Sequence, residues 1–250
     1  KTGIITGGAQ GIGKAIASQL VAMGGRAVIV DINPVTGEET CRELGNAAFY
    51  AVDLADAGQV VRVFEQIIAD EKHVDVLINN AGIVNTDDFQ DLPLEQWNKI
   101  LAVDLTAVFL ACQVCFRHMA EIGGGRIVNS TSSSIKQELD NLILSNTFRM
   151  GVVGMSKTMA REFGPYNIMV NTMGPGRIYT DRIKYLNTIR AEKAGITLEE
   201  YNTRDAASFP QKRYQTGDEY ARSVVFICSP ANSAISGQVI CVDGAMTTAY

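Results

Sequence analysis

The residues most suggestive of chemistry follow the first short apolar run of the sequence. Glycines stand at positions 7, 8, 11 and 13, directly before an amphipathic segment. Glycine lets the backbone turn sharply and approach a ligand closely, and a helix that begins there points free N–H groups and a partial positive charge at the ligand. The pattern predicts a loop that binds the diphosphate of a dinucleotide. Its expected contacts are Gly7, Gln10, Gly11, Ile12 and Gly13.

A single acidic residue, Asp31, ends the second apolar run. A carboxylate at this distance from a glycine-rich loop can accept hydrogen bonds from the adenosine ribose hydroxyls, and it would repel a 2′-phosphate. No Arg or Lys stands at positions 32 to 35 to neutralise such a phosphate. We therefore expect NAD rather than NADP as the cofactor. The alternative is that Asp31 only caps a turn.

A second polar group begins after the fifth apolar run. Ser132 is followed by Ser145 thirteen residues later and by Arg149 one helical turn beyond. A serine hydroxyl can donate a hydrogen bond to a substrate oxygen, but it is a poor general acid near neutral pH. Arg149 can bind ribose hydroxyls or stabilise negative charge, although it cannot relay a proton because its pKa exceeds about 12. These residues predict a site that binds and stabilises a negatively charged oxygen.

Seven short apolar runs rich in β-branched residues alternate with amphipathic stretches. Strands that are apolar on both faces are typical of a parallel sheet covered by helices, so we predict an α/β, Rossmann-type doubly wound parallel sheet of about seven strands. Ligands of such folds bind at the carboxyl ends of the strands. No linker or repeat divides residues 1–250, which we interpret as one dinucleotide-binding and catalytic domain. The predicted strands are 3–6, 27–31, 48–52, 74–80, 125–131, 168–173 and 238–244, and the longest predicted helix is 94–121.

The composition favours a small-molecule ligand over nucleic acid or a membrane. The formal net charge is −5, the pI is about 5.1, and the basic residues are scattered. The apolar runs are too short or too interrupted to span a bilayer, and no leader precedes the first strand, so we expect a cytoplasmic protein. Five cysteines are an odd count that suits reduced thiols, and Cys112-x-x-Cys115 is interpreted as packing. No metal is expected, and we assign His73 and His118 to the surface.

Further landmarks give the chain a family resemblance. The loop spacing T-G-x-x-x-G-x-G, the stretch "NNAG" after the fourth run, Pro175-Gly176 after the sixth and "SGQVICVDGA" near the end resemble the short-chain dehydrogenase/reductase family. The resemblance runs along nearly the whole chain. It implies a substrate lid at about 181–215 and a homotetramer built through the helices that begin near Leu94 and Leu142. It also implies cofactor contacts at Asp53, Leu54, Asn80, Ala81, Gly82, Arg149, Pro175, Gly176, Ile178 and Thr180.

Three positions depart from the family's pattern. Ser145 stands where the family has its catalytic tyrosine, Arg149 where it has a lysine, and Asp104 where it has a helix asparagine. The resemblance therefore implies a non-standard catalytic set of Ser132, Ser145, Arg149 and Asp104, similar to that of a branch of 3-oxoacyl-(acyl-carrier-protein) reductases with Ser-Asn-x-x-Arg. One interpretation is another proton source, and a second is a reaction like that of dienoyl-CoA reductases, which needs less of an acid. Candidate proton sources are Lys136, Glu138, Asp140, Tyr179 and Tyr185.

The resemblance and the residues together predict an NAD(H)-dependent oxidoreductase that interconverts a carbonyl and a secondary alcohol. The expected substrate is of the 3-oxoacyl type or resembles a polyol or sugar. The alternative is an NAD-binding sensor or scaffold that has lost hydride transfer, since serine is a far weaker acid than a tuned phenol. The motif Ser133-x-x-Lys136 also matches a class of serine hydrolases, but the partner motifs of that class are absent from the sequence.

Overall fold

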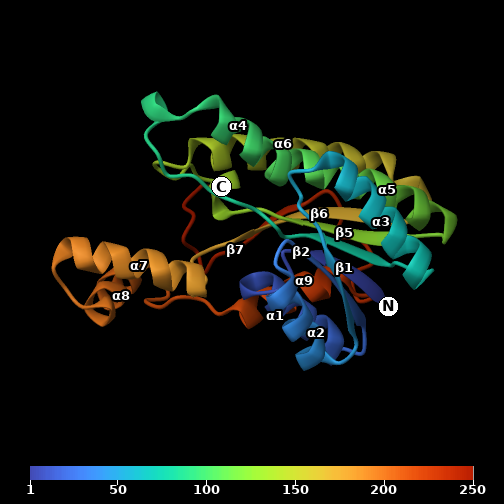
Figure 1. Cartoon of the computed structure of the whole chain (residues 1–250), viewed down its shortest axis with the longest axis horizontal. Helices are drawn as coiled ribbons and strands as arrows, with labels where there is room; N and C mark the ends of the chain where they lie inside the picture. Colours follow the sequence, from blue (N-terminus) through green and yellow to red (C-terminus); the bar gives the residue numbers. More distant parts are fainter. Residues whose placement is uncertain (250) are drawn as a thin grey trace.

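The computed structural model describes residues 1–249, and one seven-stranded sheet runs through them (Figure 1). Every neighbouring pair of strands is parallel, and the order is β3-β2-β1-β4-β5-β6-β7. The order reverses between β1 and β4, and such a reversal opens a crevice at the carboxyl ends of these two strands. The predicted doubly wound α/β fold is confirmed. The strands are β1 (Thr2–Thr6), β2 (Arg26–Asp31), β3 (Ala47–Ala51), β4 (Val76–Asn79), β5 (Gly125–Ser130), β6 (Ile168–Pro175) and β7 (Val239–Val242).

Helices cover both faces of this sheet because the strands are apolar on both sides. Ile4 packs into the core on one face, and its neighbour Ile5 packs into the core on the other. The first core is closed by α3 (Ala57–Glu71), α5 (Ala107–Glu121) and α6 (Ile143–Glu162). The second is closed by α1 (Gly11–Ala22), α2 (Pro34–Leu44) and α9 (Gly217–Cys228), which lie on the opposite side in Figure 1.

The long helical segment Leu94–Glu121 is interrupted near its middle. It consists of α4 (Leu94–Leu101), one π-helical turn (Ala102–Thr106) and α5. The sequence predicted its bounds but not the interruption, which places Asp104 in a widened turn where only 4% of the residue is exposed. A π turn inserts an extra residue and is frequent at functional sites.

The segment Leu94–Glu121 is also long and apolar enough to cross a membrane by length and composition. We expected no such run. Its second half, α5, packs against the sheet with Cys112, Cys115 and Met119 buried in the core. The two cysteines therefore serve as packing residues, as predicted, and burial raises the pKa of the Cys112 thiol to about 12.

Two further helices project from the body at the far left of Figure 1, α7 (Asp181–Ala194) and α8 (Leu198–Ala207). They occupy the predicted lid region, 181–215. The start of α8 is a capping box, in which the Thr197 hydroxyl accepts from the Glu200 backbone N–H and the Glu200 carboxylate accepts from the Thr197 backbone N–H. This confirms the helix that the stretch "TLEEYNTRDAAS" predicts.

A polar network holds these two helices together. The buried side chain of Asn187 on α7 donates hydrogen bonds to the Asn202 carbonyl, at 2.8 Å, and to the Tyr214 hydroxyl, at 2.9 Å. Tyr214 in turn donates to Asp205, and Asn202 donates to the hydroxyl of Tyr179 at 3.0 Å. The network therefore ties α7, α8 and the segment after β6 into one unit.

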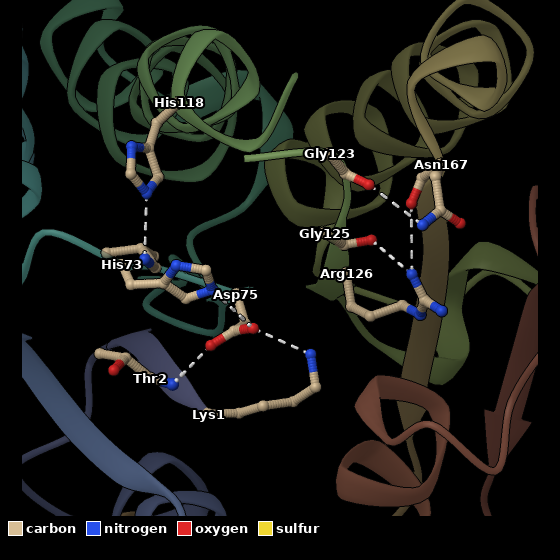
Figure 2. A network of polar contacts seen from close by, with 10 residues as sticks. Lys1, Thr2, His73, Asp75, His118, Gly123, Gly125, Arg126 and Asn167 are labelled. Atoms are coloured by element: carbon tan, nitrogen blue, oxygen red, sulfur yellow. Dashed lines mark hydrogen bonds and ion pairs between the residues drawn. The ribbon is translucent and has the colours of Figure 1, made fainter. Parts of the chain in front are cut away.

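Figure 2 shows two separate groups of polar contacts at the amino-terminal ends of the strands. One joins the starts of β1 and β4 to α5, and the other joins the start of β5 to the turn before β6. The Lys1 ammonium pairs with Asp75 at 2.9 Å, and the Val74 backbone N–H donates to Nε2 of His118 at 3.0 Å. The prediction that His118 lies at the surface is wrong, because its ring is buried as the acceptor for this N–H group. Burial lowers the pKa of His118 and keeps the ring neutral.

The segment after β7 lies at the carboxyl ends of the strands. The backbone N–H and the hydroxyl of Thr248 donate to the Gln137 side-chain carbonyl at 3.0 and 3.1 Å. Gln137 belongs to the segment that follows β5. The segment after β7 is thereby held beside the loop that carries Ser132.

Candidate active site

A cleft of about 660 Å³ opens at the carboxyl ends of β1 to β4, where the reversal of strand order predicts a ligand site. Most of the predicted cofactor residues line it. Pro175, Gly176, Ile178 and Arg149 do not lie on its walls. The predicted residues that line the cleft are Gly7, Gln10, Gly11, Ile12, Gly13, Asp31, Asp53, Leu54, Asn80, Ala81, Gly82 and Thr180.

The glycine-rich loop has the geometry that its sequence predicts. Gly7 and Gly11 adopt positive φ angles of 65° and 56°, which other residues rarely adopt. A Cβ atom on Gly13 would stand 2.0 Å from the carbonyl oxygen of Gly7, so only glycine fits there. The N-cap residue of α1, Gln10, makes no side-chain capping bond. The first N–H groups of α1 therefore remain free to bind an anionic group in the cleft.

The Asp31 carboxylate is anchored at the rim of the cleft. One oxygen accepts from the Ala9 backbone N–H and the other from the Asn33 backbone N–H, both at 3.2 Å. Asp31 therefore does cap a turn, as the alternative interpretation held, and it also lines the cleft. Each carboxylate oxygen can accept a further hydrogen bond, so the cap leaves Asp31 able to bind a ribose.

A residue that the sequence did not single out, Thr6, holds two walls of the cleft together. Its hydroxyl accepts from the backbone N–H groups of Asn80 and Ala81 at 2.9 and 3.0 Å. The Asn80 side chain donates back to the Thr6 carbonyl at 3.1 Å. These bonds fix the segment after β4 against the end of β1. The only feature of the sequence that could have pointed to this role is a hydroxyl residue at the last position of β1.

Asp104 meets two residues of another helix, Ser145 and Arg149, behind the cleft. Ser145 and Arg149 lie one turn apart on α6, and Nε of Arg149 donates to Oγ of Ser145 at 3.0 Å. Nη2 of Arg149 lies 3.3 Å from Oδ2 of Asp104, whose other oxygen accepts from the Ile83 backbone N–H at 2.9 Å. The side chains of Arg149 and Asp104 are 12% and 1% exposed, so the ion pair is largely removed from water, and Ser145 beside it is 2% exposed.

The electrostatics of this group follow from its burial. Burial raises the pKa of Asp104 above its ordinary value, while the cations of Arg149 and Arg182 oppose the rise. Arg182, at the start of α7, lines the cleft, and partial burial together with the neighbouring Arg149 lowers its pKa. Two cations therefore share one carboxylate, and the region has an excess of positive charge that suits a ligand oxygen carrying negative charge.

Comparisons with known proteins assign the chain to a family. The sequence profile of a family described as enoyl-(acyl carrier protein) reductase matches residues 7–247. The chain belongs to the short-chain dehydrogenase/reductase family. It is 33% identical to D-threitol dehydrogenase of Mycolicibacterium smegmatis, over 99% of this chain and 93% of that protein. It is 32% identical to 3-oxoacyl-[acyl-carrier-protein] reductase of Aquifex aeolicus, over 98% of this chain and 97% of that protein.

The fold is equally close to solved members of the family. L-sorbose reductase from Gluconobacter frateurii, complexed with NADPH and L-sorbose, superimposes with a TM-score of 0.96 at 28% sequence identity, over 100% of this chain and 97% of that one. The protein is therefore a short-chain dehydrogenase/reductase enzyme, an oxidoreductase that uses a nicotinamide cofactor and a small-molecule substrate.

Within this family member, the two predicted catalytic serines are in different environments. Ser132 is half-buried, and its Oγ accepts from the Ser134 backbone N–H at 3.2 Å at the start of a 3-10 turn (Ser133–Ile135). Ser145 is buried, and its Oγ accepts from Arg149. Neither serine lines the cleft, and the five residues named above as candidate proton sources do not line it either.

Three of the predicted cofactor residues lie between the sheet and helices α7 and α8. Ile178 is buried in the core, and its backbone pairs with that of Gln215. Thr180 is the N-cap of α7 and accepts from the Ile183 backbone N–H at 3.4 Å. A Cβ atom on Gly176 would stand 2.6 Å from Asp243, so the chain after β6 packs closely against the segment after β7. The segment after β6 therefore connects the sheet directly to α7.

Proposed function

We propose that this enzyme is an NAD(H)-dependent oxidoreductase that interconverts a ketone and a secondary alcohol on a substrate resembling a polyol or sugar. The observation that carries the proposal is the cleft itself. Its glycine-rich loop and Asp31 suit the adenosine diphosphate half of the cofactor, and Gly82 and Ile83 at its wall contact the charged group around Arg149. We also expect residues 1–250 to act as one domain.

The choice of NAD over NADP rests on Asp31. Its carboxylate is held at the rim of the cleft by two backbone N–H groups, and the residues at 32 to 35 supply no cation. A 2′-phosphate there would meet an uncompensated negative charge. In this proposal Asp53 and Leu54 contact the adenine. The nicotinamide end is held by Asn80, Ala81, Gly82, Arg149, Pro175, Gly176, Ile178 and Thr180.

The reaction that we propose is balanced by one hydride and one proton. When bound, the reduced cofactor supplies the hydride to the carbonyl carbon, and a proton from water completes the alcohol. Arg149 stabilises the negative charge that develops on the substrate oxygen but cannot deliver the proton itself. Oγ of Ser132 accepts from the Ser134 N–H, which leaves the hydroxyl hydrogen of Ser132 free to donate to the same oxygen.

The proposed substrate class rests on the polar wall of the cleft and on the relatives. Asp181 and Arg182 line the cleft at the lid, where hydroxyl groups of a ligand would find both an acceptor and a donor. D-threitol dehydrogenase and L-sorbose reductase are among the similar proteins. A 3-oxoacyl substrate is the alternative, since a 3-oxoacyl-[acyl-carrier-protein] reductase is nearly as similar in sequence.

The test is to load the enzyme with NADH, confirm binding by fluorescence, and follow nicotinamide absorbance with two groups of compounds. One group contains ketoses and keto-polyols, and the other contains 3-oxoacyl thioesters. Loss of the NADH signal with the first group supports the proposal, and loss only with the second replaces the substrate class. NADPH in place of NADH tests the cofactor preference.

A second candidate function is an NAD-binding sensor without hydride transfer. The observation in its favour is that Ser145, at the position of the family's tyrosine, is buried and hydrogen-bonded to Arg149. Tight NADH binding with a persistent absorbance signal across both groups of compounds would support this candidate over the first.

We further expect a homotetramer in the cytoplasm, as the family resemblance implies. Phe109 on α5 and Met150 on α6 are 47% and 48% exposed, and Phe226 on α9 is 48% exposed. Large apolar side chains that stay exposed on the helices of both faces are typical of subunit contacts. Light scattering of the purified protein measures the assembly, and a monomer would contradict this expectation.

A further inference from the structure

We infer that Ser145 and Asp104 are positioning residues, which fix the guanidinium of Arg149 against the cleft wall at Gly82 and do not themselves meet the substrate. The inference deepens the proposed function and rests on it in one respect, namely that the cofactor occupies the cleft. Of these three residues, it assigns the contact with cofactor or substrate oxygens to Arg149 alone.

Hydrogen-bond direction is the first argument. A guanidinium only donates, so Oγ of Ser145 must be the acceptor in its 3.0 Å bond with Nε of Arg149. Ser145 is 2% exposed, whereas the Arg149 side chain keeps 12% of its surface exposed. The Ser145 oxygen therefore accepts from the arginine, and its burial separates the hydroxyl from a ligand in the cleft.

The second argument is the state of the Asp104 carboxylate. Oδ1 accepts from the Ile83 N–H, but Oδ2 is buried and has no hydrogen bond within residues 1–249. Its nearest cationic atom is Nη2 of Arg149, 3.3 Å away. A buried carboxylate without a partner is costly, so the ion pair with Arg149 is what makes Asp104 tolerable as an anion.

The arrangement leaves part of the guanidinium for a ligand. Nε is used by Ser145 and one side of Nη2 faces Asp104, while Nη1 of Arg149 has no protein partner within the described chain. Nη2 also lies only 2.7 Å from the position that a Cβ atom on residue 82 would occupy, and Gly82 lines the cleft. Ser145 and Asp104 therefore hold the cation directly behind Gly82 of the cleft wall.

A double-mutant cycle on NADH affinity tests the role of Ser145. We expect Ser145→Ala to weaken NADH binding roughly three- to tenfold, the effect of one lost hydrogen bond to a charged group. Arg149→Met should weaken it further, and the double variant should bind no more weakly than Arg149→Met alone. Ser18→Ala, on the exposed face of α1, is the matched control. Additive losses would overturn the inference.

The role of Asp104 has its own pair of variants. In Asp104→Asn, the side chain must either turn an NH2 group toward the guanidinium or lose the acceptor for the Ile83 N–H, so NADH affinity should fall. Asp104→Asn/Arg149→Lys, which restores the family's neutral residue and shorter cation, should bind NADH better than Asp104→Asn alone. A double variant that binds no better, with both proteins folded by circular dichroism, would contradict the inference.

The pH dependence of NADH binding adds a readout that a purely structural role would not change. Protonation of Asp104 as the pH falls removes its pairing with Arg149, and the only other charged group acting on Asp104 is Arg182 among the described residues. NADH affinity of the wild type should therefore fall on the acid side, and that fall should be absent from Asp104→Asn. An identical acid limb in both proteins would overturn the role of Asp104.

The outcomes separate this inference from the proposed function. NADH binding with a non-additive cycle but no turnover on any carbonyl compound would retain the positioning roles and refute the oxidoreductase. Turnover with additive losses, or with a Ser145→Ala defect in kcat alone and unchanged NADH affinity, would retain the oxidoreductase and refute the positioning roles. Absence of binding to both NADH and NADPH would refute both.

Discussion

Gly82 and Arg149 occupy adjoining space, since a Cβ atom on residue 82 would lie only 2.7 Å from Nη2 of Arg149. The atom in the way is the far end of a flexible side chain, so a larger residue at position 82 would displace the guanidinium rather than the backbone. Arg149 would then leave Asp104, its buried counter-ion. Gly82, the glycine of the "NNAG" stretch, thus leaves the space that the Arg149 guanidinium occupies.

Gly82→Ala should therefore retain the fold and weaken NADH binding about tenfold, equivalent to roughly 1.4 kcal/mol. The control is Gly154→Ala in the interior of α6, where a Cβ atom would meet nothing within 4 Å and should stabilise the helix by about 1 kcal/mol. Fluorescence titration and thermal melting measure the two effects. Unchanged NADH affinity in Gly82→Ala would show that Arg149 does not act at the cleft wall.

Asp31→Ala should relax the preference for NADH over NADPH by about tenfold, because the charge that repels the 2′-phosphate is gone. Asp31→Asn should do the same while retaining an acceptor for one of the two backbone N–H groups at the rim. Glu38→Ala, exposed on α2, is the control. Dissociation constants for both cofactors are compared, and an unchanged ratio in both Asp31 variants would refute the argument from charge.

His118 should make stability depend on pH. Burial lowers its pKa below the ordinary value of about 6.5, so the unfolded chain binds more protons than the folded one between these two values. The stabilising effect is full above about pH 6.5 and is lost as the pH falls through the lowered pKa. His73 also acts to lower this pKa, whereas Glu121 and Asp75 act to raise it.

The measurement is urea unfolding of wild type and His118→Gln at several values between about pH 7.5 and pH 5. Glutamine still offers an acceptor to the Val74 N–H but does not titrate, so the acid loss of stability should be smaller in this variant. Parallel curves for the two proteins would mean that other groups cause the acid sensitivity.

Tyr214→Phe should loosen the lid without unfolding the sheet. It removes the hydroxyl that accepts from Asn187 and donates to Asp205, at a local cost of about 1–3 kcal/mol. Hydrogen exchange should accelerate in α7 and α8 and stay unchanged in the strands. Tyr166→Phe, whose ring is 48% exposed, is the control. Equal exchange in wild type and Tyr214→Phe would show that the network does not hold the lid.

The strands were predictable because each is a short apolar run bounded by glycine or polar residues. All seven lie within or beside their predicted ranges, and the glycine-rich loop follows β1 as expected. These features are local, since both the pattern and the structure it produces lie within a few residues. The π turn around Asp104 was not predictable in this way, because the surrounding residues have good helical periodicity.

The candidate site was predictable only in its parts. Spacing along α6 places Ser145 and Arg149 on one face, but it does not reveal that the serine is buried or that Asp104, from another helix, pairs with the arginine. The lid network escaped prediction for the same reason, since Asn187 and Tyr214 are joined only by tertiary packing. Contacts between distant segments depend on how elements pack, and one sequence has no local signal for that.

The two ends of the described chain differ as attachment points. Lys1 lies with Asp75 at the amino-terminal ends of the strands, across the sheet from the cleft, whereas Thr248 is bonded to Gln137 beside the Ser132 loop. A fluorophore, affinity handle or surface linker joined through the first residues would therefore stay clear of the ligand. The same group placed after Thr248 would lie beside the Ser132 loop, so assays and immobilised preparations are best built from the amino-terminal side.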